Sequence, residues 1–126
     1  MLLVRTSLRS SPIHGMGCFA EEPIKNGQVI WVFNPFMDVR LPVEEVAKFP
    51  EAIREFWGMY AYEEIHNEVR TATLSCDFSR HMNHSATPNI HKGTTATRDI
   101  EVGEELTCDY YTFALDADRL LANKTA

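Results

Sequence analysis

The sequence predicts a single, mostly-β domain with one helical patch. Two segments rich in β-branched and aromatic residues, Leu2–Leu8 and Gln28–Phe33, have the composition of strands. The second half of the chain returns to short apolar runs separated by loops, in which Gly93 and Gly103 mark turns. A chain of 126 residues is long enough for one hydrophobic core but not for two, so we expect one domain over residues 1–126.

The helical patch lies in the middle of the chain. Pro42 can begin a first turn and Pro50 a second helix, because a proline at the first helical position loses no hydrogen bond. The second helix has apolar side chains spaced i, i+3, i+4 and i+7, namely Ile53, Phe56, Trp57 and Tyr60. We interpret this stripe as core packing. A further short helix is expected at Leu115–Leu121.

Composition and charge restrict the class of protein. The chain has 44% hydrophobic and 24% charged residues, which is typical of a soluble globular protein. It contains no run of about 18 apolar residues, so we expect no membrane span. The net charge of −6 argues against nucleic-acid binding through a basic face, and an acidic surface would instead attract a basic protein tail. The same charge also serves plain solubility.

The cysteines and the N-terminus indicate a reducing compartment. Cys18, Cys76 and Cys108 are an odd number without a C-x-x-C pair, which does not suit a disulfide framework. The apolar run at the N-terminus is too short for a signal peptide. We therefore expect a cytoplasmic protein, or a nuclear one if its source is eukaryotic. The spacing of Cys76 and the nearby histidines matches no zinc frame, so no metal site is expected.

Three segments carry the polar and glycine residues that suggest chemistry. The first is His14–Ala20, where two glycines allow close approach of the backbone to a ligand. The second is Arg80–Asn89, which contains the polar run Asn-His-Ser before a proline turn. The third is Gly103–Tyr110, whose alternation predicts a strand with Leu106, Cys108 and Tyr110 on one face.

Taken in this order, the three segments resemble the SET domain of lysine methyltransferases: a G-x-G loop, an R-x-x-N-H-S-x-x-P-N segment and a G-E-E-L-T-x-D-Y strand. The resemblance extends from about Val4 to about Tyr111. A variable insert at about 41–74 matches only loosely, and a short tail follows at about 112–126. The resemblance implies a β-clip-like fold of small curved sheets, in which the C-terminal segment threads under the Asn83 loop.

The resemblance also implies a function, that of a protein-lysine N-methyltransferase using S-adenosylmethionine. Main-chain groups of the glycine loop would hold the methionine part of the cofactor. The Asn83 amide would meet its charged amino-acid end, and His84 would meet the adenine largely through its backbone. The Tyr110 hydroxyl would lie at the transfer site. The implied cofactor-binding residues are therefore Gly15, Met16, Gly17, Asn83, His84 and Tyr110.

Lysine methylation also needs a channel for the substrate side chain. A free lysine amine has a pKa of about 10.4, so an apolar channel that desolvates it helps it to lose its proton. Two tyrosines in the insert could supply a second catalytic hydroxyl; we favour Tyr62 over Tyr60, because Tyr60 belongs to the helical stripe. Phe113 and the following segment are expected to wall the channel. Cys108 stands where the family has a larger ring, so we expect a roomy pocket that allows di- or trimethylation.

Besides Cys108, a second departure from the family pattern and a missing tail are seen, and two alternative functions remain. The stretch Asn89–Ala96 is shorter than the strand pair usual for the family, and no cysteine-rich zinc tail follows the last motif. One alternative function is an inactive module of the same fold that binds a basic tail. Another is a homodimer in which a second copy supplies missing channel walls. For the enzyme, the expected partner is a protein with an exposed lysine.

Overall fold

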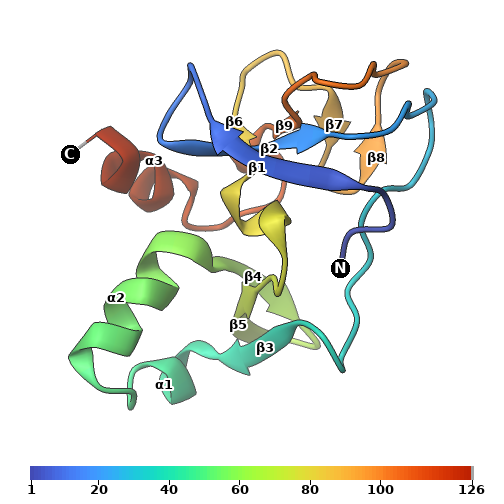
Figure 1. Cartoon of the computed structure of the whole chain (residues 1–126). Helices are drawn as coiled ribbons and strands as arrows, with labels where there is room; N and C mark the ends of the chain where they lie inside the picture. Colours follow the sequence, from blue (N-terminus) through green and yellow to red (C-terminus); the bar gives the residue numbers. More distant parts are fainter. Residues whose placement is uncertain (126) are drawn as a thin grey trace.

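The computed structural model describes residues 1–125; Ala126, the last residue of the expected tail, lies outside the described residues. Within that range the chain forms three small sheets, three α-helices and two 3-10 helices (Figure 1). This mostly-β architecture confirms the predicted fold class. No helix in residues 1–125 combines the length and the apolar character needed to cross a bilayer.

The first sheet presents the glycine loop. Strands β1 (Thr6–Ser10) and β2 (Met16–Ala20) pair antiparallel, and the connection between them closes through a 2.8 Å bond from the Ser11 N–H to the Gly15 carbonyl. Gly15 has a φ of +45°, a conformation that glycine adopts without strain. The loop is therefore fixed at both ends by the hairpin.

The second sheet and two helices form the middle of the chain, shown in the lower part of Figure 1. The sheet order is β3 (Val39–Pro42), β5 (Val69–Leu74) and β4 (Tyr62–His66), all antiparallel. Helix α1 (Val43–Val46) follows Pro42, and α2 (Glu51–Tyr60) follows Pro50, as the two prolines predicted.

The third sheet places the C-terminal segment between two earlier ones. Its order is β6 (Asn83–His84), β9 (Thr107–Cys108), β7 (Ile90–His91) and β8 (Thr95–Ala96), and β9 runs parallel to both β6 and β7. The short hairpin of β7 and β8 turns through Lys92 and Gly93, both with positive φ. The parallel pairing of β6 with β9 brings the second and third motifs side by side.

Two predicted strands differ from the structure. The strand expected at Leu2–Leu8 is β1, which begins only at Thr6. The segment Gln28–Phe33 forms no named strand; it has isolated bridges from Val29 to Thr95 and from Trp31 to Leu2. Its partner changes from one residue to the next, so no continuous ladder develops. The alternation in the third motif is also shorter than predicted, because Thr107 is buried against Asn89 and Tyr110 already begins a 3-10 helix, η2 (Tyr110–Thr112).

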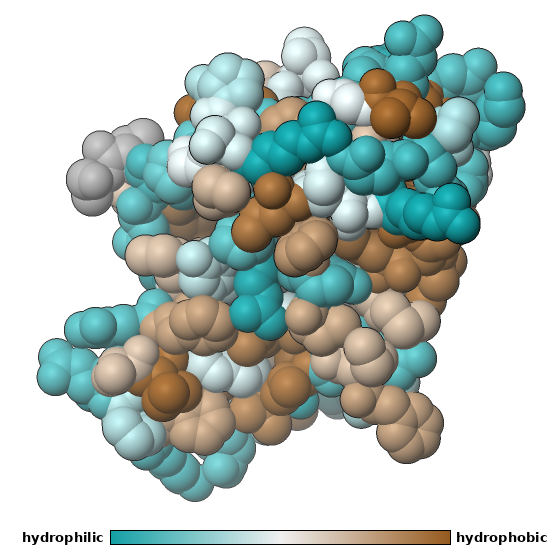
Figure 2. Space-filling view, in the orientation of Figure 1, coloured by the Kyte–Doolittle hydropathy of each residue, from teal (hydrophilic) through white to brown (hydrophobic). Residues whose placement is uncertain are grey.

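The apolar stripe of α2 is not core packing, which corrects the prediction. Only Trp57 is buried, in a small cluster with Ala61 and Ala72, whereas Ile53 and Phe56 remain 44% and 40% exposed. Trp57 alone faces the β3–β5–β4 sheet, and Phe56 lies instead beneath the guanidinium of Arg80. Figure 2 accordingly shows apolar surface among polar residues over the part of the molecule that contains α1, α2 and this sheet.

The main core joins the first sheet, the third sheet and the last helix. Ile24, Ile30, Ile90, Ile100 and Leu106 are the largest of its fully buried apolar side chains. Helix α3 (Ala117–Thr125) adds to this core, and it confirms the helix expected near Leu115–Leu121. Helix α3 also contacts α2, and it lies above that helix in Figure 1.

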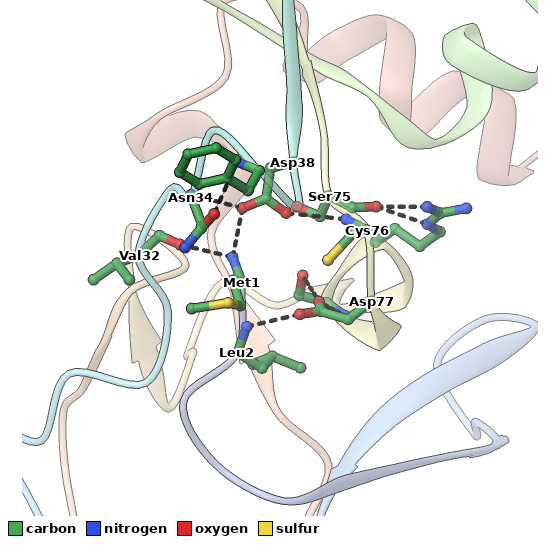
Figure 3. A network of polar contacts seen from close by, with 11 residues as sticks. Met1, Leu2, Val32, Asn34, Asp38, Ser75, Cys76 and Asp77 are labelled. Atoms are coloured by element: carbon green, nitrogen blue, oxygen red, sulfur yellow. Dashed lines mark hydrogen bonds and ion pairs between the residues drawn. The ribbon is translucent and has the colours of Figure 1, made fainter.

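A polar network ties the start of the chain to the middle (Figure 3). The Asp38 side chain is buried and accepts bonds from the Met1 ammonium at 2.8 Å, the Asn34 N–H at 2.9 Å and the Cys76 N–H at 3.0 Å. Asp77 accepts the Leu2 N–H at 2.7 Å beside it. The network fixes the loop before β3 and the turn after β5 to the N-terminal segment.

Candidate functional site

The predicted channel residues meet in one cavity of about 590 Å³, a size suited to a cofactor with part of a substrate. Seven residues predicted from the sequence line it: Gly15, Met16, Tyr60, Tyr62, Cys108, Tyr110 and Phe113. They come from the glycine loop, the end of α2, the start of β4 and the segment from β9 to η2. Residues far apart in sequence thus converge on one space.

Tyr110 is fixed at both its main chain and its hydroxyl. Asp109 caps η2 by accepting the Tyr111 N–H, and Tyr110, the first residue of η2, is buried. The Tyr110 hydroxyl donates to the Met82 carbonyl at 2.6 Å, and its N–H donates to Nδ1 of His84 at 3.1 Å. Burial raises the pKa of Tyr110, so its hydroxyl stays protonated and acts as a hydrogen-bond donor rather than a base.

Aromatic rings connect Tyr110 to the expected channel wall. The Phe113 ring lies 6.1 Å from that of Tyr110 and 5.2 Å from that of Tyr62, edge to face in both cases. Tyr60 instead contacts His81, at 5.0 Å. Both tyrosines line the cavity, but only Tyr62 belongs to the aromatic series that reaches Tyr110. Burial raises the pKa of Tyr62 to about 12, so it too remains a neutral phenol.

Asn83 organises the glycine loop. Its amide nitrogen donates to the carbonyls of His14 and Met16, at 3.0 and 3.2 Å, and to the Glu105 carboxylate at 2.9 Å. Its Oδ1 accepts the Lys124 ammonium at 2.8 Å. Asn83 is only 1% exposed, so these bonds satisfy a buried amide. The direct contact of Asn83 with a cofactor stays a prediction. The structure shows in addition that the Asn83 amide bonds to the carbonyls on both sides of Gly15.

The two glycines of the loop have different roles. Gly15 lines the cavity, and no atom lies within 4 Å of the position that a Cβ would take there. Gly17 lines neither described cavity, and a Cβ on it would lie 2.6 Å from Oε2 of Glu105. The Glu105 carboxylate is held there by the Ser11 hydroxyl, at 2.8 Å. Gly17 therefore makes room for the Glu105 side chain, whereas Gly15 leaves space open in the wall of the larger cavity.

His84 lies in a smaller adjoining cavity of about 170 Å³. Six residues line it: Ile13, His14, Asn83, His84, Leu121 and Lys124. The bond from the Tyr110 N–H to His84 Nδ1 holds the His84 ring in place beside Tyr110. His14 and Lys124 line both cavities, so the two spaces meet at these residues.

Several residues that line the site carried no sequence signal, and Lys124 and Trp31 are two of them. Lys124 reaches the site from the last turn of α3, 41 residues from Asn83. Trp31 lines the larger cavity, and within residues 1–125 its indole Nε1 is the one buried side-chain polar atom without a hydrogen-bond partner. An unpaired buried donor costs about 1–3 kcal/mol, and a bound ligand with an acceptor would remove that cost.

Cys108 lines the cavity as a buried neutral thiol, with its pKa raised to about 12 by burial. All three cysteines are free. In the part of the chain that the structure describes, no three histidine, cysteine or acidic side chains gather in a way that could hold a metal ion.

The comparisons with known proteins agree with this geometry. Residues 15–111 match the SET domain family model, and the chain belongs to the SET domain family. Members of this family are S-adenosylmethionine-dependent lysine methyltransferases.

Solved structures share the fold. An autoinhibited Chaetomium thermophilum Polycomb Repressive Complex 2 bound to S-adenosylmethionine aligns over 97% of this chain, with 21% identity and a TM-score of 0.66. A humanized mutant of that complex, bound to an inhibitor, aligns over 92% with 22% identity and a TM-score of 0.65. This chain spans only 17% and 16% of those two chains. A Plasmodium falciparum protein described as a candidate histone methyltransferase aligns over 86% of this chain and 95% of its own, with 20% identity and a TM-score of 0.59.

Proposed function

We propose that this protein is an S-adenosylmethionine-dependent protein-lysine N-methyltransferase. The observation that carries the proposal is the convergence of Tyr110, the Tyr62–Phe113 wall and the glycine loop on one cavity. Family membership supports the same reaction class.

The residues present fit the cofactor. The cradle is open at Gly15, the unpaired Trp31 indole N–H offers a donor, and Lys124 brings a positive charge. When bound, S-adenosylmethionine would supply an electrophilic methyl: a C–N bond forms to the lysine amine, the C–S bond breaks, and S-adenosylhomocysteine leaves. The glycine loop would hold its methionine part, and the small cavity at His84 would take the adenine.

The chain's own residues would prepare the amine. The rings of Tyr62 and Phe113 would enclose the lysine stem and exclude water, which favours the neutral amine over the ammonium ion. The Tyr110 hydroxyl oxygen and the Met82 carbonyl beside it would orient that amine by accepting its N–H groups, which leaves the amine lone pair free to attack. The proton leaves the ammonium ion to solvent before transfer, because a neutral buried phenol accepts no proton.

A basic protein segment is the substrate class that charge supports, since the chain carries a net charge of −6. The test is incubation of the purified protein with methyl-tritiated cofactor and either histones or a lysate of its source. The expected result is a labelled lysine, absent with Tyr110→Phe. Cofactor binding without label in any substrate would contradict the enzymatic proposal and favour the inactive binding module.

A further inference from the structure

Lys124 places a charged group where the two cavities meet. Its Nζ lies 2.8 Å from Oδ1 of Asn83 and 5.2 Å from the centre of the Tyr110 ring. The side chain comes from the last turn of α3, which packs into the main core through Leu120. The ammonium is therefore held beside the glycine loop and beside the predicted transfer site at once.

The Lys124 ammonium has no ionic partner in the part of the chain that the structure describes. None of the ion pairs formed by residues 1–125 includes it, although acidic residues outnumber basic ones by 18 to 12 over the sequence. The neutral amide of Asn83 is its acceptor. Partial burial disfavours the charged form, so desolvation lowers the pKa of Lys124, although the Glu105 carboxylate, which also contacts Asn83, opposes that shift from beyond ion-pair distance. A ligand carboxylate would supply the missing charge.

We propose that Lys124 binds the carboxylate at the methionine end of S-adenosylmethionine, an inference that rests on the function proposed above. The cofactor has one anionic group and two cationic ones, an ammonium and a sulfonium. An ammonium of the protein repels both cationic groups and attracts the carboxylate. Because Lys124 also contacts Asn83, which bonds to the carbonyls of His14 and Met16, the carboxylate would lie at the edge of the glycine loop.

In a second possible arrangement, the Lys124 ammonium would weaken cofactor binding instead of strengthening it. If the Lys124 ammonium instead occupied the place of the sulfonium, it would compete with the cofactor and weaken its binding. The two arrangements can be separated with three ligands: S-adenosylmethionine, S-adenosylhomocysteine, which lacks the sulfonium charge, and decarboxylated S-adenosylmethionine, which lacks the carboxylate.

The experiment measures the affinity of each ligand by calorimetry for the wild-type chain and for Lys124→Met. We expect the wild type to bind the carboxylated cofactor about 10- to 100-fold more tightly than the decarboxylated one, the scale of one charge-assisted hydrogen bond. In Lys124→Met that preference should fall close to one, and the two carboxylated ligands should weaken by a similar factor. Lys124→Arg, which keeps the charge, should retain part of the preference.

Two controls remove a lysine elsewhere. Lys25→Met changes the net charge equally at an exposed turn, and Lys92→Met removes a second lysine that lines the larger cavity. Both should keep the preference for the carboxylate. Thermal unfolding of each variant shows that it is folded; should Lys124→Met fail to fold, Lys124→Gln takes its place.

Several outcomes would overturn the assignment. One is a Lys124→Met variant that still prefers the carboxylated cofactor over the decarboxylated one. Another is a loss of this preference in Lys92→Met but not in Lys124→Met. Tighter binding of S-adenosylmethionine by Lys124→Met, with unchanged binding of S-adenosylhomocysteine, would establish the second arrangement. In all three cases the proposed function would stand, because the wild type binds the cofactor. A wild type that binds none of the three ligands would overturn the proposed function together with this inference.

Discussion

The Tyr110 hydroxyl donates to the Met82 carbonyl at 2.6 Å, which joins the two motif segments on either side of the parallel β6–β9 pair. Tyr110 is buried and its ring faces the larger cavity. Two oxygen atoms, of a hydroxyl and of the carbonyl that it bonds to, thus lie together at the end of the aromatic channel. This pair is the polar part of a wall that is otherwise formed by rings.

Tyr110→Phe should lower kcat by about a hundredfold or more, the scale on which one positioned hydrogen-bonding group acts at a reacting centre. Cofactor affinity should change much less, because the hydroxyl acts on the reacting groups. Steady-state kinetics and calorimetry measure the two effects. Tyr111→Phe is the matched control: its hydroxyl bonds to Asp118 on the surface, and its loss should leave kcat unchanged. If Tyr110→Phe kept most of the wild-type rate, another residue would have the catalytic role, and Tyr62 would be the next residue to test.

Asn83→Ala should weaken both cofactor binding and the fold. Removing the amide leaves Lys124 and the carbonyls of His14 and Met16 without a partner, so we expect a loss of about 1–3 kcal/mol in the free energy of unfolding. Urea unfolding measures it, and calorimetry measures the affinity. Asn123→Ala deletes an exposed amide with one bond to Gly58 and should change stability by less than about 0.5 kcal/mol. Equal, small effects in both variants would show that the Asn83 bonds do not hold the loop.

Gly17→Ala tests the finding that this glycine accommodates Glu105. A methyl group there would lie 2.6 Å from a carboxylate oxygen that Ser11 and Asn83 hold in place, so we expect destabilisation by about 1–3 kcal/mol. Gly58→Ala is the matched control, because its Cβ would meet only the end of Arg119, at 3.4 Å, inside helix α2. That variant should gain about 0.5–1 kcal/mol from helix propensity. Chemical denaturation measures the free energy of unfolding of both variants. A Gly17→Ala variant as stable as the wild type would show that Glu105 moves away at little cost.

Much of this site was predictable from sequence because its parts are local motifs. The glycine loop, the Asn83–His84 pair and Tyr110 each belong to a short segment, and the prolines that begin α1 and α2 act within one turn. The remaining features depend on tertiary contacts. Periodicity placed Ile53, Phe56, Trp57 and Tyr60 on one stripe, but it could not tell which of them the neighbouring sheet would cover. Nor does any local pattern mark Lys124 or Trp31, since their roles follow from where α3 and the 28–33 segment pack.

Cys108 should set the degree of methylation. It is a small, neutral thiol in the cavity wall, where a larger ring would fill space needed by a second or third methyl group. We expect di- or trimethyl-lysine from the wild type and a shift toward monomethyl-lysine from Cys108→Tyr, both measured by mass spectrometry of the product. Cys108→Ser, nearly equal in volume, should keep the wild-type distribution. If the wild type gave only monomethyl-lysine and Cys108→Tyr gave the same product, Cys108 would not limit the number of methyl groups. Phe113 or Tyr62 would then be the residue that limits it.

The buried carboxylate of Asp38 pairs with the Met1 ammonium and should make the stability of the fold depend on pH. Burial alone would raise the pKa of Asp38, but bonds from Met1, Asn34 and Cys76 outweigh it and the pKa is lowered. A carboxyl group with a folded-state pKa below its unfolded value, about 3.9, stabilises the fold above that pH. This contribution is lost as the pH falls through the lower, folded-state pKa.

Asp38→Asn should therefore cost about 1–3 kcal/mol at pH 7, the range for removing a charged acceptor from donors that it holds in a part-buried site. The difference from wild type should shrink as the pH falls below about 4, because the wild-type carboxylate is then protonated as well. Urea unfolding at a series of pH values measures both. Asp99→Asn, at an exposed turn where the carboxylate accepts the Asn26 N–H, should cost far less. A difference between Asp38→Asn and wild type that stays constant from pH 7 to pH 3 would show that side-chain shape, and not the charge on Asp38, holds the network together.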